Sequence, residues 1–242
     1  MTFADLLSAE LRREPGRPLV TFYDETTGER IELSVTTYAN WVAKAASLLV
    51  DEHGLERGDV LLVDLPTHWL GPVFLGAAWT AGLAVAFPSS AGRPSAVVCG
   101  PAGLDAWAER AEQLPVLACS LLPMGVRFAE PLPPGAHDVG VEVWGQPDAF
   151  MPYDPPTGAD LALVDGQVTH DELFRIPTAA GSPGTATDGG RLLVTANPAS
   201  PPGVAAVARP LATSGSLVLV TGASEARLDE IAEAERVTRR FG

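Results

Sequence analysis

The sequence predicts an α/β protein in which mostly parallel sheets form three layers with helices. Two observations lead to that prediction. Short apolar runs alternate with stretches of helical periodicity along most of the 242 residues, a pattern typical of βαβ units. The run at residues 60–65, Val-Leu-Leu-Val-Asp-Leu, is almost continuously apolar, as expected for a strand that is covered on both faces of a parallel sheet.

A segment rich in proline, glycine and aspartate divides this alternation in two. Residues 145–159 contain four prolines and two glycines, which favour turns over regular elements. We therefore predict two α/β sub-domains, residues 1–150 and residues 151–242.

The first part of the chain predicts a helix, a hairpin and a second helix. Residues 3–11 have amphipathic spacing, and strands are expected at 19–23 and 30–33, joined by a hairpin-type turn. The second helix runs from about residue 35 to Gly54. Lys44, the single lysine of the chain, lies off its apolar stripe, so we predict a solvated side chain.

Residues 69–88 contain no charge and are long enough to raise the question of a membrane span. Apolar residues from Leu70 to Ala81 instead follow helical spacing on one face, and Gly82 suits a helix C-terminus. Residues 83–87 then have the composition of a strand. This order predicts a helix followed by a strand, and no membrane span.

The remaining elements continue the alternation. Further strands are expected at residues 95–98, 116–118, 126–129, 139–144, 161–164, 191–195 and 216–220, and further helices at residues 102–113, from 169, at 201–212 and at 224–238. The strand at 139–144 is predicted because valine occupies every second position.

The net charge indicates which partners to exclude, and the cysteines and the N-terminus indicate the compartment. The net charge of −14 would repel nucleic acid and anionic membrane surfaces. Cys99 and Cys119 lie outside any metal-binding spacing, so we expect buried, reduced thiols. The N-terminus lacks a basic segment of the kind that begins a secretory signal. We therefore predict a cytoplasmic protein without nucleic-acid or membrane partners.

Three segments carry a more specific pattern. Residues 33–42 are Leu-Ser-Val-Thr-Thr-Tyr-Ala-Asn-Trp-Val, residues 54–66 are Gly-Leu-Glu-Arg-Gly-Asp-Val-Leu-Leu-Val-Asp-Leu-Pro, and residues 74–88 are Phe-Leu-Gly-Ala-Ala-Trp-Thr-Ala-Gly-Leu-Ala-Val-Ala-Phe-Pro. In order and spacing they resemble the opening of the adenylate-forming enzymes, which include acyl-CoA synthetases, luciferases and peptide-synthetase adenylation domains. Val168-Thr169-His170 and residues 191–220 resemble later segments of the same enzymes, so the resemblance covers most of the chain.

The resemblance implies the fold of part of the N-terminal domain of these enzymes. Family members adenylate a carboxylate with ATP and Mg²⁺, using a loop rich in Ser, Thr and Gly that ends in a lysine just before the Thr-His helix. In this chain only Asp165, Gly166 and Gln167 separate the strand from Val168-Thr169. Three residues, one of them acidic, cannot wrap a triphosphate.

Other elements of the family also have no counterpart before Gly242. They are the segment that holds adenine and metal, the aspartate on the ribose hydroxyls, and the small C-terminal domain with the catalytic lysine. The sequence is therefore identified as a truncated, degenerate member of the adenylate-forming superfamily, for which we predict no catalytic residue, no metal ligand and no cofactor.

Five residues are weak candidates for cofactor contacts. They are His68, Thr169, His170, Ser182 and Thr185. His68 follows a strand at the sheet edge where open α/β sheets bind ligands, although a histidine at a helix N-terminus is the interpretation that we favour. Ser182 and Thr185 lie in a glycine-rich stretch that has the composition of a displaced anion-binding loop, but it lacks a lysine and follows the helix, which favours a flexible surface loop.

Thr169 and His170 have a structural interpretation as well. Thr169 and Glu172 have the spacing of a capping box, in which each side chain bonds the other residue's backbone N–H. A metal site built from His170, Asp171 and Glu172 is disfavoured, because consecutive helical residues point in different directions.

We therefore predict a non-catalytic pseudoenzyme that acts as a binding or interaction module. Two alternatives stay open: a degenerate acyl-CoA or adenylate ligase that is active only with a partner chain, and a small-molecule sensor. Because part of the family's core is missing, surface that is normally covered should be apolar, and we expect self-association or a protein partner.

Overall fold

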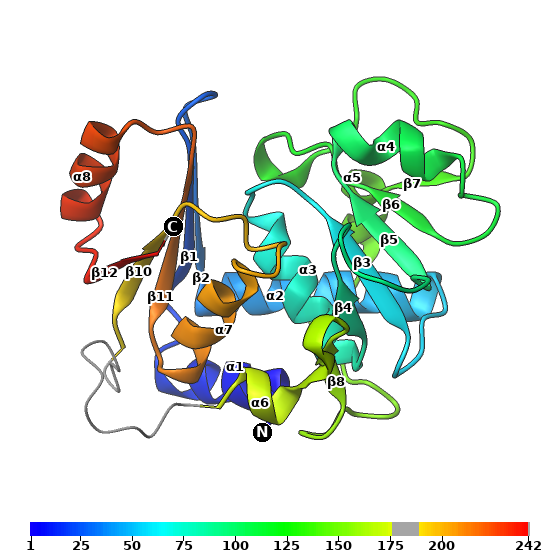
Figure 1. Ribbon diagram of the computed structural model, residues 1–242, viewed down its shortest axis with the longest axis horizontal. Helices are drawn as coiled ribbons and strands as arrows, with labels where there is room; N and C mark the ends of the chain where they lie inside the picture. The colour runs from blue at the N-terminus through cyan, green and yellow to red at the C-terminus, as the bar shows by residue number, and fades with distance from the viewer. Residues whose placement is uncertain (176–188, 242) are drawn as a thin grey trace.

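The computed structural model describes residues 1–175 and 189–241, which form two β-sheets with helices between them and outside them (Figure 1). One sheet has five strands in the order β12-β10-β11-β1-β2. Its strands are β1 (Pro18–Asp24), β2 (Glu29–Ser34), β10 (Arg191–Val194), β11 (Ser216–Thr221) and β12 (Arg239–Phe241). Only the β1–β2 hairpin is antiparallel in this sheet.

The second sheet has seven strands in the order β7-β6-β5-β3-β4-β8-β9. Its strands are β3 (Val60–Asp64), β4 (Ala84–Ala86), β5 (Ala96–Cys99), β6 (Val116–Ala118), β7 (Ala136–Asp138), β8 (Leu161–Leu163) and β9 (Val168–Thr169). All pairs are parallel except β8 with β9. The predicted α/β class with mostly parallel sheets is confirmed.

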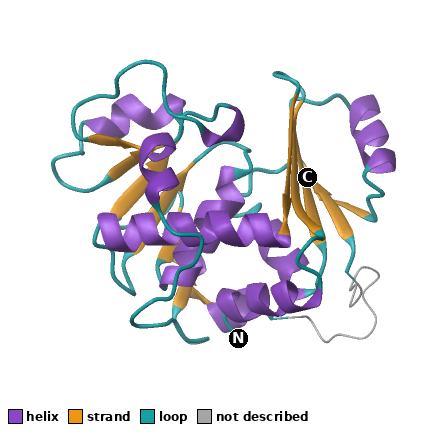
Figure 2. Cartoon of the chain, turned by 180° about the vertical axis from the view of Figure 1, so that it is seen from behind, coloured by secondary structure: helices purple, strands orange, loops and turns teal. Residues whose placement is uncertain are grey.

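Helices cover both faces of each sheet. The α-helices are α1 (Phe3–Arg13), α2 (Val35–Ser47), α3 (Leu70–Ala81), α4 (Pro101–Ala108), α5 (Val139–Glu142), α6 (His170–Leu173), α7 (Val204–Ala212) and α8 (Glu225–Ala234). A π-helical turn, η1 (Leu48–Glu52), extends α2, and three 3₁₀ turns are η2 (Pro123–Gly125), η3 (Val143–Gly145) and η4 (Asp165–Gln167). From behind, helices fill the space between the two sheets (Figure 2), while α8 lies outside the five-stranded sheet.

The burial of β3 shows why its sequence is apolar throughout. Leu61 and Val63 face the main core between the sheets, whereas Leu62 joins a second cluster with Leu104 of α4. Alternate side chains of a strand point to opposite faces, so each face of this parallel sheet requires apolar residues.

Helix α3 lies at the centre of the main core. Nearly all of its residues are buried, and the indole N–H of Trp79 donates to the Ala162 carbonyl at 3.0 Å. Gly76 is required by packing, because a Cβ there would lie 2.7 Å from both Phe3 and Tyr38. The helix ends at Gly82, whose φ of 80° is the left-handed conformation that favours glycine. Among the described residues no helix has both the length and the apolar character needed to cross a bilayer.

Two predicted strands are wrong. Residues 139–144 form α5 and the start of η3, because the Asp138 carboxylate accepts the Gly140 N–H and begins a helix. Val139 and Val143 are buried while Val141 is exposed, so the alternating valines also satisfy the four-residue spacing of a helix. Residues 126–129 form no strand, since the Phe128 N–H donates to the Asp138 side chain at 3.0 Å instead of to a neighbouring strand.

Two further details differ from expectation. Lys44 is not solvated: its side chain is 17% exposed, and its ammonium contacts the Gln146 carbonyl and, at 3.1 Å, Asp148. Strands β7, β9 and β12 were not predicted; in β12, Arg239 and Arg240 do not have the composition of a strand. Cys99 and Cys119 are buried and unpaired as expected, and burial raises the pKa of Cys99 to about 12.

Sheet membership runs across the boundary predicted near residue 150. β1 and β2 lie in the sheet of β10 to β12, whereas β8 and β9 lie in the sheet of β3 to β7. Whether residues 1–150 and 151–242 behave as separate units stays a prediction.

Candidate functional site

The connection from β8 to α6 is the place where the sequence predicts a missing phosphate loop. After Leu163 the chain makes one 3₁₀ turn, η4, in which Gly166 and Gln167 have φ of 70° and 51°. The chain then turns back as β9, which pairs antiparallel with β8. The connection is therefore a tight reversal. Its one acidic residue, Asp165, accepts the Ser90 hydroxyl at 2.6 Å.

The N-terminus of α6 is occupied by side chains of this chain. Thr169 and Glu172 form the predicted capping box. One carboxylate oxygen of Glu172 accepts the Thr169 N–H at 2.9 Å and its hydroxyl at 2.8 Å, and these bonds lower the pKa of Glu172. Asp171 adds a second carboxylate to the first turn. Negative charge at this helix end repels an anion that the helix dipole would otherwise attract.

His170 is fully buried beside the same turn. Its ring lies 5.9 Å from the Phe174 ring, and within residues 1–175 and 189–241 neither ring nitrogen has a hydrogen-bond partner. Burial lowers the pKa of His170 to about 4, so the ring is neutral at pH 7.

His68 has a different surrounding. Its Nδ1 accepts the Leu70 N–H at 3.2 Å at the start of α3, and its ring contacts Phe22, with centroids 5.0 Å apart. Burial lowers the pKa of His68 to about 4. Ser182 and Thr185 lie outside the described residues. The roles of all five candidates as cofactor contacts stay predictions.

Arg57 and Lys44 are both held by other groups of the chain. Arg57 donates to both carboxylate oxygens of Asp160, the residue before β8, at 2.9 and 2.8 Å, and to Asp154 at 2.8 Å. Lys44 is held on α2 by Gln146 and Asp148. A bidentate arginine–carboxylate pair leaves fewer donors for a phosphate.

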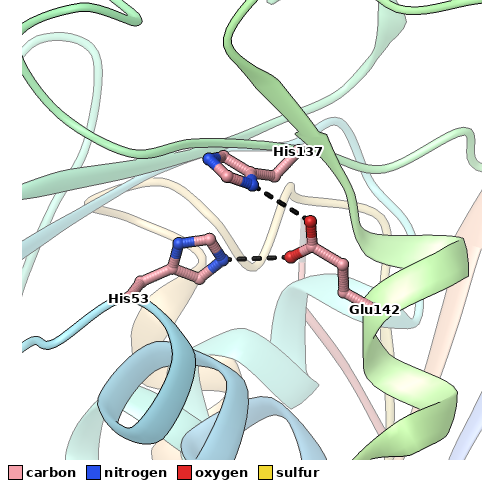
Figure 3. A group of neighbouring side chains, drawn as sticks. All are labelled: His53, His137 and Glu142. Atoms are coloured by element: carbon pink, nitrogen blue, oxygen red, sulfur yellow. Dashed lines mark hydrogen bonds and ion pairs between the residues drawn. The ribbon is translucent and has the colours of Figure 1, made fainter.

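A second group of ionisable side chains lies at the opposite edge of the seven-stranded sheet. It consists of His53, His137 and Glu142, which we call the His-Glu cluster (Figure 3). His53 follows η1, His137 lies in the edge strand β7, and Glu142 ends α5. Nε2 of His53 lies 3.1 Å from Glu142 Oε2, and Nδ1 of His137 lies 3.0 Å from Glu142 Oε1.

Sequence reasoning missed this cluster. His53 and His137 are 84 residues apart, so no local spacing connects them. The available signal was the placement of His137 and Glu142 on either side of Asp138, a residue type that begins helices. The interpretation of residues 139–144 as a strand concealed it.

Comparison with curated proteins gives one relative of similar length. A protein of Mycobacterium tuberculosis (strain ATCC 25618 / H37Rv) described as "TIGR03089 family protein" is 35% identical over 241 residues, which span 97% of this chain and 95% of that protein. The chain belongs to the TIGR03089 family. No protein-family model matches it.

The fold of this TIGR03089 protein resembles that of solved acyl-CoA ligases. An acyl-CoA synthetase of Brucella canis superposes with a TM-score of 0.75 at 18% identity, covering 99% of this chain and 47% of that one. A putative long-chain-fatty-acid CoA ligase of Rhodopseudomonas palustris gives 0.71 at 16% identity, with coverages of 99% and 62%. The TIGR03089 chain thus spans about half the length of the first of these structures. The predicted relation to adenylate-forming enzymes is confirmed at the level of fold.

Proposed function

We propose that this TIGR03089 protein is a non-catalytic, cytoplasmic member of the adenylate-forming fold that acts as a binding or interaction module. The observation that carries the proposal is the connection between β8 and α6. Three residues form it, and the helix end that would face a phosphate is capped by the Glu172 carboxylate.

Electrostatics supports this proposal. Adenylation requires donors and cations arranged around a triphosphate before it reacts. Here Asp165, Asp171 and Glu172 lie in or beside the connection, and Arg57 is bonded to Asp160. An ATP molecule at this place would meet like charge, and would have to break an existing ion pair to gain Arg57.

The test is release of pyrophosphate from ATP and Mg²⁺ with a panel of carboxylic acids. A mock purification from cells that lack the chain serves as the control. We expect equal rates in both samples. A rate above the mock that elutes together with the protein on two different columns would contradict the proposal. Calorimetry with ATP, AMP, CoA and fatty acids then shows whether any of them binds without reacting.

A ligase that requires a partner chain is the second candidate. The coverage favours it, because more than half of the Brucella canis synthetase lies outside the matched region. The test is co-purification of a second chain, followed by ATP turnover assays on each chain and on their mixture. Turnover in the mixture alone would support this candidate over the first.

The surface also has a groove that is a candidate binding site for a small molecule. This groove of about 280 Å³ lies between α1, α2 and the loop that contains Phe150. It is lined mainly by small and apolar side chains, among them Leu7, Leu11 and Ala43. Native mass spectrometry of untreated protein tests for a small molecule there, and Ala43→Trp, which fills the groove, should release it.

A further inference from the structure

The geometry of the His-Glu cluster points to a metal site. We propose that His53, His137 and Glu142 bind a zinc-type divalent transition-metal ion through three protein ligands, with a fourth position open to water. The proposal does not depend on the function proposed above.

The ligand atoms of the three residues lie close together. One nitrogen from each ring and the Glu142 carboxylate all lie within 4.8 Å of one another. In a tetrahedron with bonds of about 2.0–2.1 Å, neighbouring ligand atoms are roughly 3.3–3.4 Å apart. The two histidine–glutamate distances, 3.1 and 3.0 Å, are close to this value, but they end on different carboxylate oxygens of Glu142. One of the two nitrogens therefore has to move toward the oxygen that ligates the ion.

The two histidine nitrogens have to approach each other to share an ion. The His137 side chain is 40% exposed, and the His53 side chain is 6% exposed. Rotation of the exposed His137 ring toward the fixed His53 ring closes the site without disturbing the core. The rings already meet edge to face, with centroids 4.4 Å apart.

The donor set selects the class of ion. Two imidazole nitrogens and one carboxylate oxygen form a combination that zinc accepts with three protein ligands and one open position. Imidazole also suits copper, nickel and iron. Magnesium and calcium prefer oxygen ligands, so we do not expect them here.

The charges around the cluster favour a cation. Glu52 lies close enough to act on His53 electrostatically and accepts the Gln146 amide at 3.3 Å. An ion at the cluster would therefore meet two carboxylates, in a chain whose net charge is −14.

The three ligands come from separate elements, so a bound ion would cross-link them. Figure 3 shows the His53 ring reaching from the end of a helix, with the other two side chains reaching from the opposite side. The ion would join the end of η1 to β7 and α5. Since β7 is an edge strand, this cross-link would fasten the edge of the seven-stranded sheet to the helical layer.

The test is calorimetry with zinc chloride on the full chain, stripped with a chelator and carrying no oligohistidine tag. We expect one zinc ion per chain, and an affinity that falls at least 100-fold in His137→Ala and in Glu142→Gln. Glu130→Gln, which changes an exposed glutamate elsewhere, is the matched control and should bind like the wild type. His137 is partly exposed, so its loss is not expected to unfold the chain.

Two further measurements test whether zinc binds through these ligands and to the folded chain. Cobalt in place of zinc should give visible absorption typical of four ligands including imidazole, and that absorption should be lost in His137→Ala. Zinc should raise the melting temperature of the wild type with increasing concentration, because it binds the folded state. Zinc binding that is equally tight in wild type, His137→Ala and Glu142→Gln, or no stoichiometric binding in the wild type, would overturn the proposal.

Discussion

The β8–α6 connection and the His-Glu cluster contain the same kinds of side chain in opposite situations. At the connection, the Glu172 carboxylate is used by the Thr169 backbone and hydroxyl, and the His170 ring is sealed in the core. At the cluster, the Glu142 carboxylate contacts two ring nitrogens, and the side chains of His137 and Glu142 are 40% and 31% exposed. The difference teaches that residue type alone does not make a site: the donors must also be free to exchange their present partner for a ligand.

The largest effect is expected at His170, which should make the folded chain less stable in acid. This effect tests the contrast because it depends on the ring being sealed in the core. Its pKa is about 4 in the folded chain, against an ordinary value of 6.5. Between these values the unfolded chain binds one more proton, so stability falls as the pH drops from 6.5 toward 4. The loss amounts to about 1.4 kcal/mol per pH unit.

Chemical denaturation of wild type and His170→Leu between pH 4 and 7 measures this contribution. The variant should lose stability less steeply below about pH 6.5, because leucine has no proton to bind. His68→Leu should act in the same direction, since burial lowers the pKa of His68 to about 4 as well. Parallel pH profiles for wild type and His170→Leu would show that His170 is protonated without unfolding.

A smaller effect is expected from the capping box. Thr169→Ala removes the hydroxyl that accepts the Glu172 N–H, which should cost about 1 kcal/mol and lower the melting temperature by roughly 2–4 °C. Thr195→Ala, at an exposed position, is the control. Calorimetry should show no ATP binding to Thr169→Ala. ATP binding that appears in Thr169→Ala would mean that the cap alone blocks an otherwise intact phosphate site.

The smallest effect concerns self-association, which stays a prediction. Val141 and Trp144, on either side of Glu142, are 55% and 49% exposed. If copies meet at this surface, Trp144→Glu should lower the average mass measured by light scattering at micromolar concentration. Met151→Glu, a change at another exposed apolar residue, should have less effect. A wild-type protein that is monomeric throughout would disprove the prediction.

Much of the fold could be predicted because local signals agreed with tertiary contacts. The helix at 70–81 ends at Gly82 in the left-handed conformation, and Thr169 and Glu172 form the expected capping box. The same local logic failed at residues 139–144, where valines at alternate positions fit both a strand and a short helix, and Asp138 decided between them.

The candidate site could be predicted only in part. The short connection after Leu163 is visible in the sequence because it is contiguous. The His-Glu cluster depends on how η1, β7 and α5 meet in space, and no periodicity encodes that meeting. His68 and His170 were singled out by their neighbours in sequence, whereas burial determines their chemistry.

The five-stranded sheet ends on each side in a charged strand. β2 carries Glu29, Arg30 and Glu32, and β12 carries Arg239 and Arg240. Charged side chains at a sheet border hinder another chain from adding its own backbone there. Copies of this protein are therefore expected to resist growth into extended β-aggregates from the edges of this sheet.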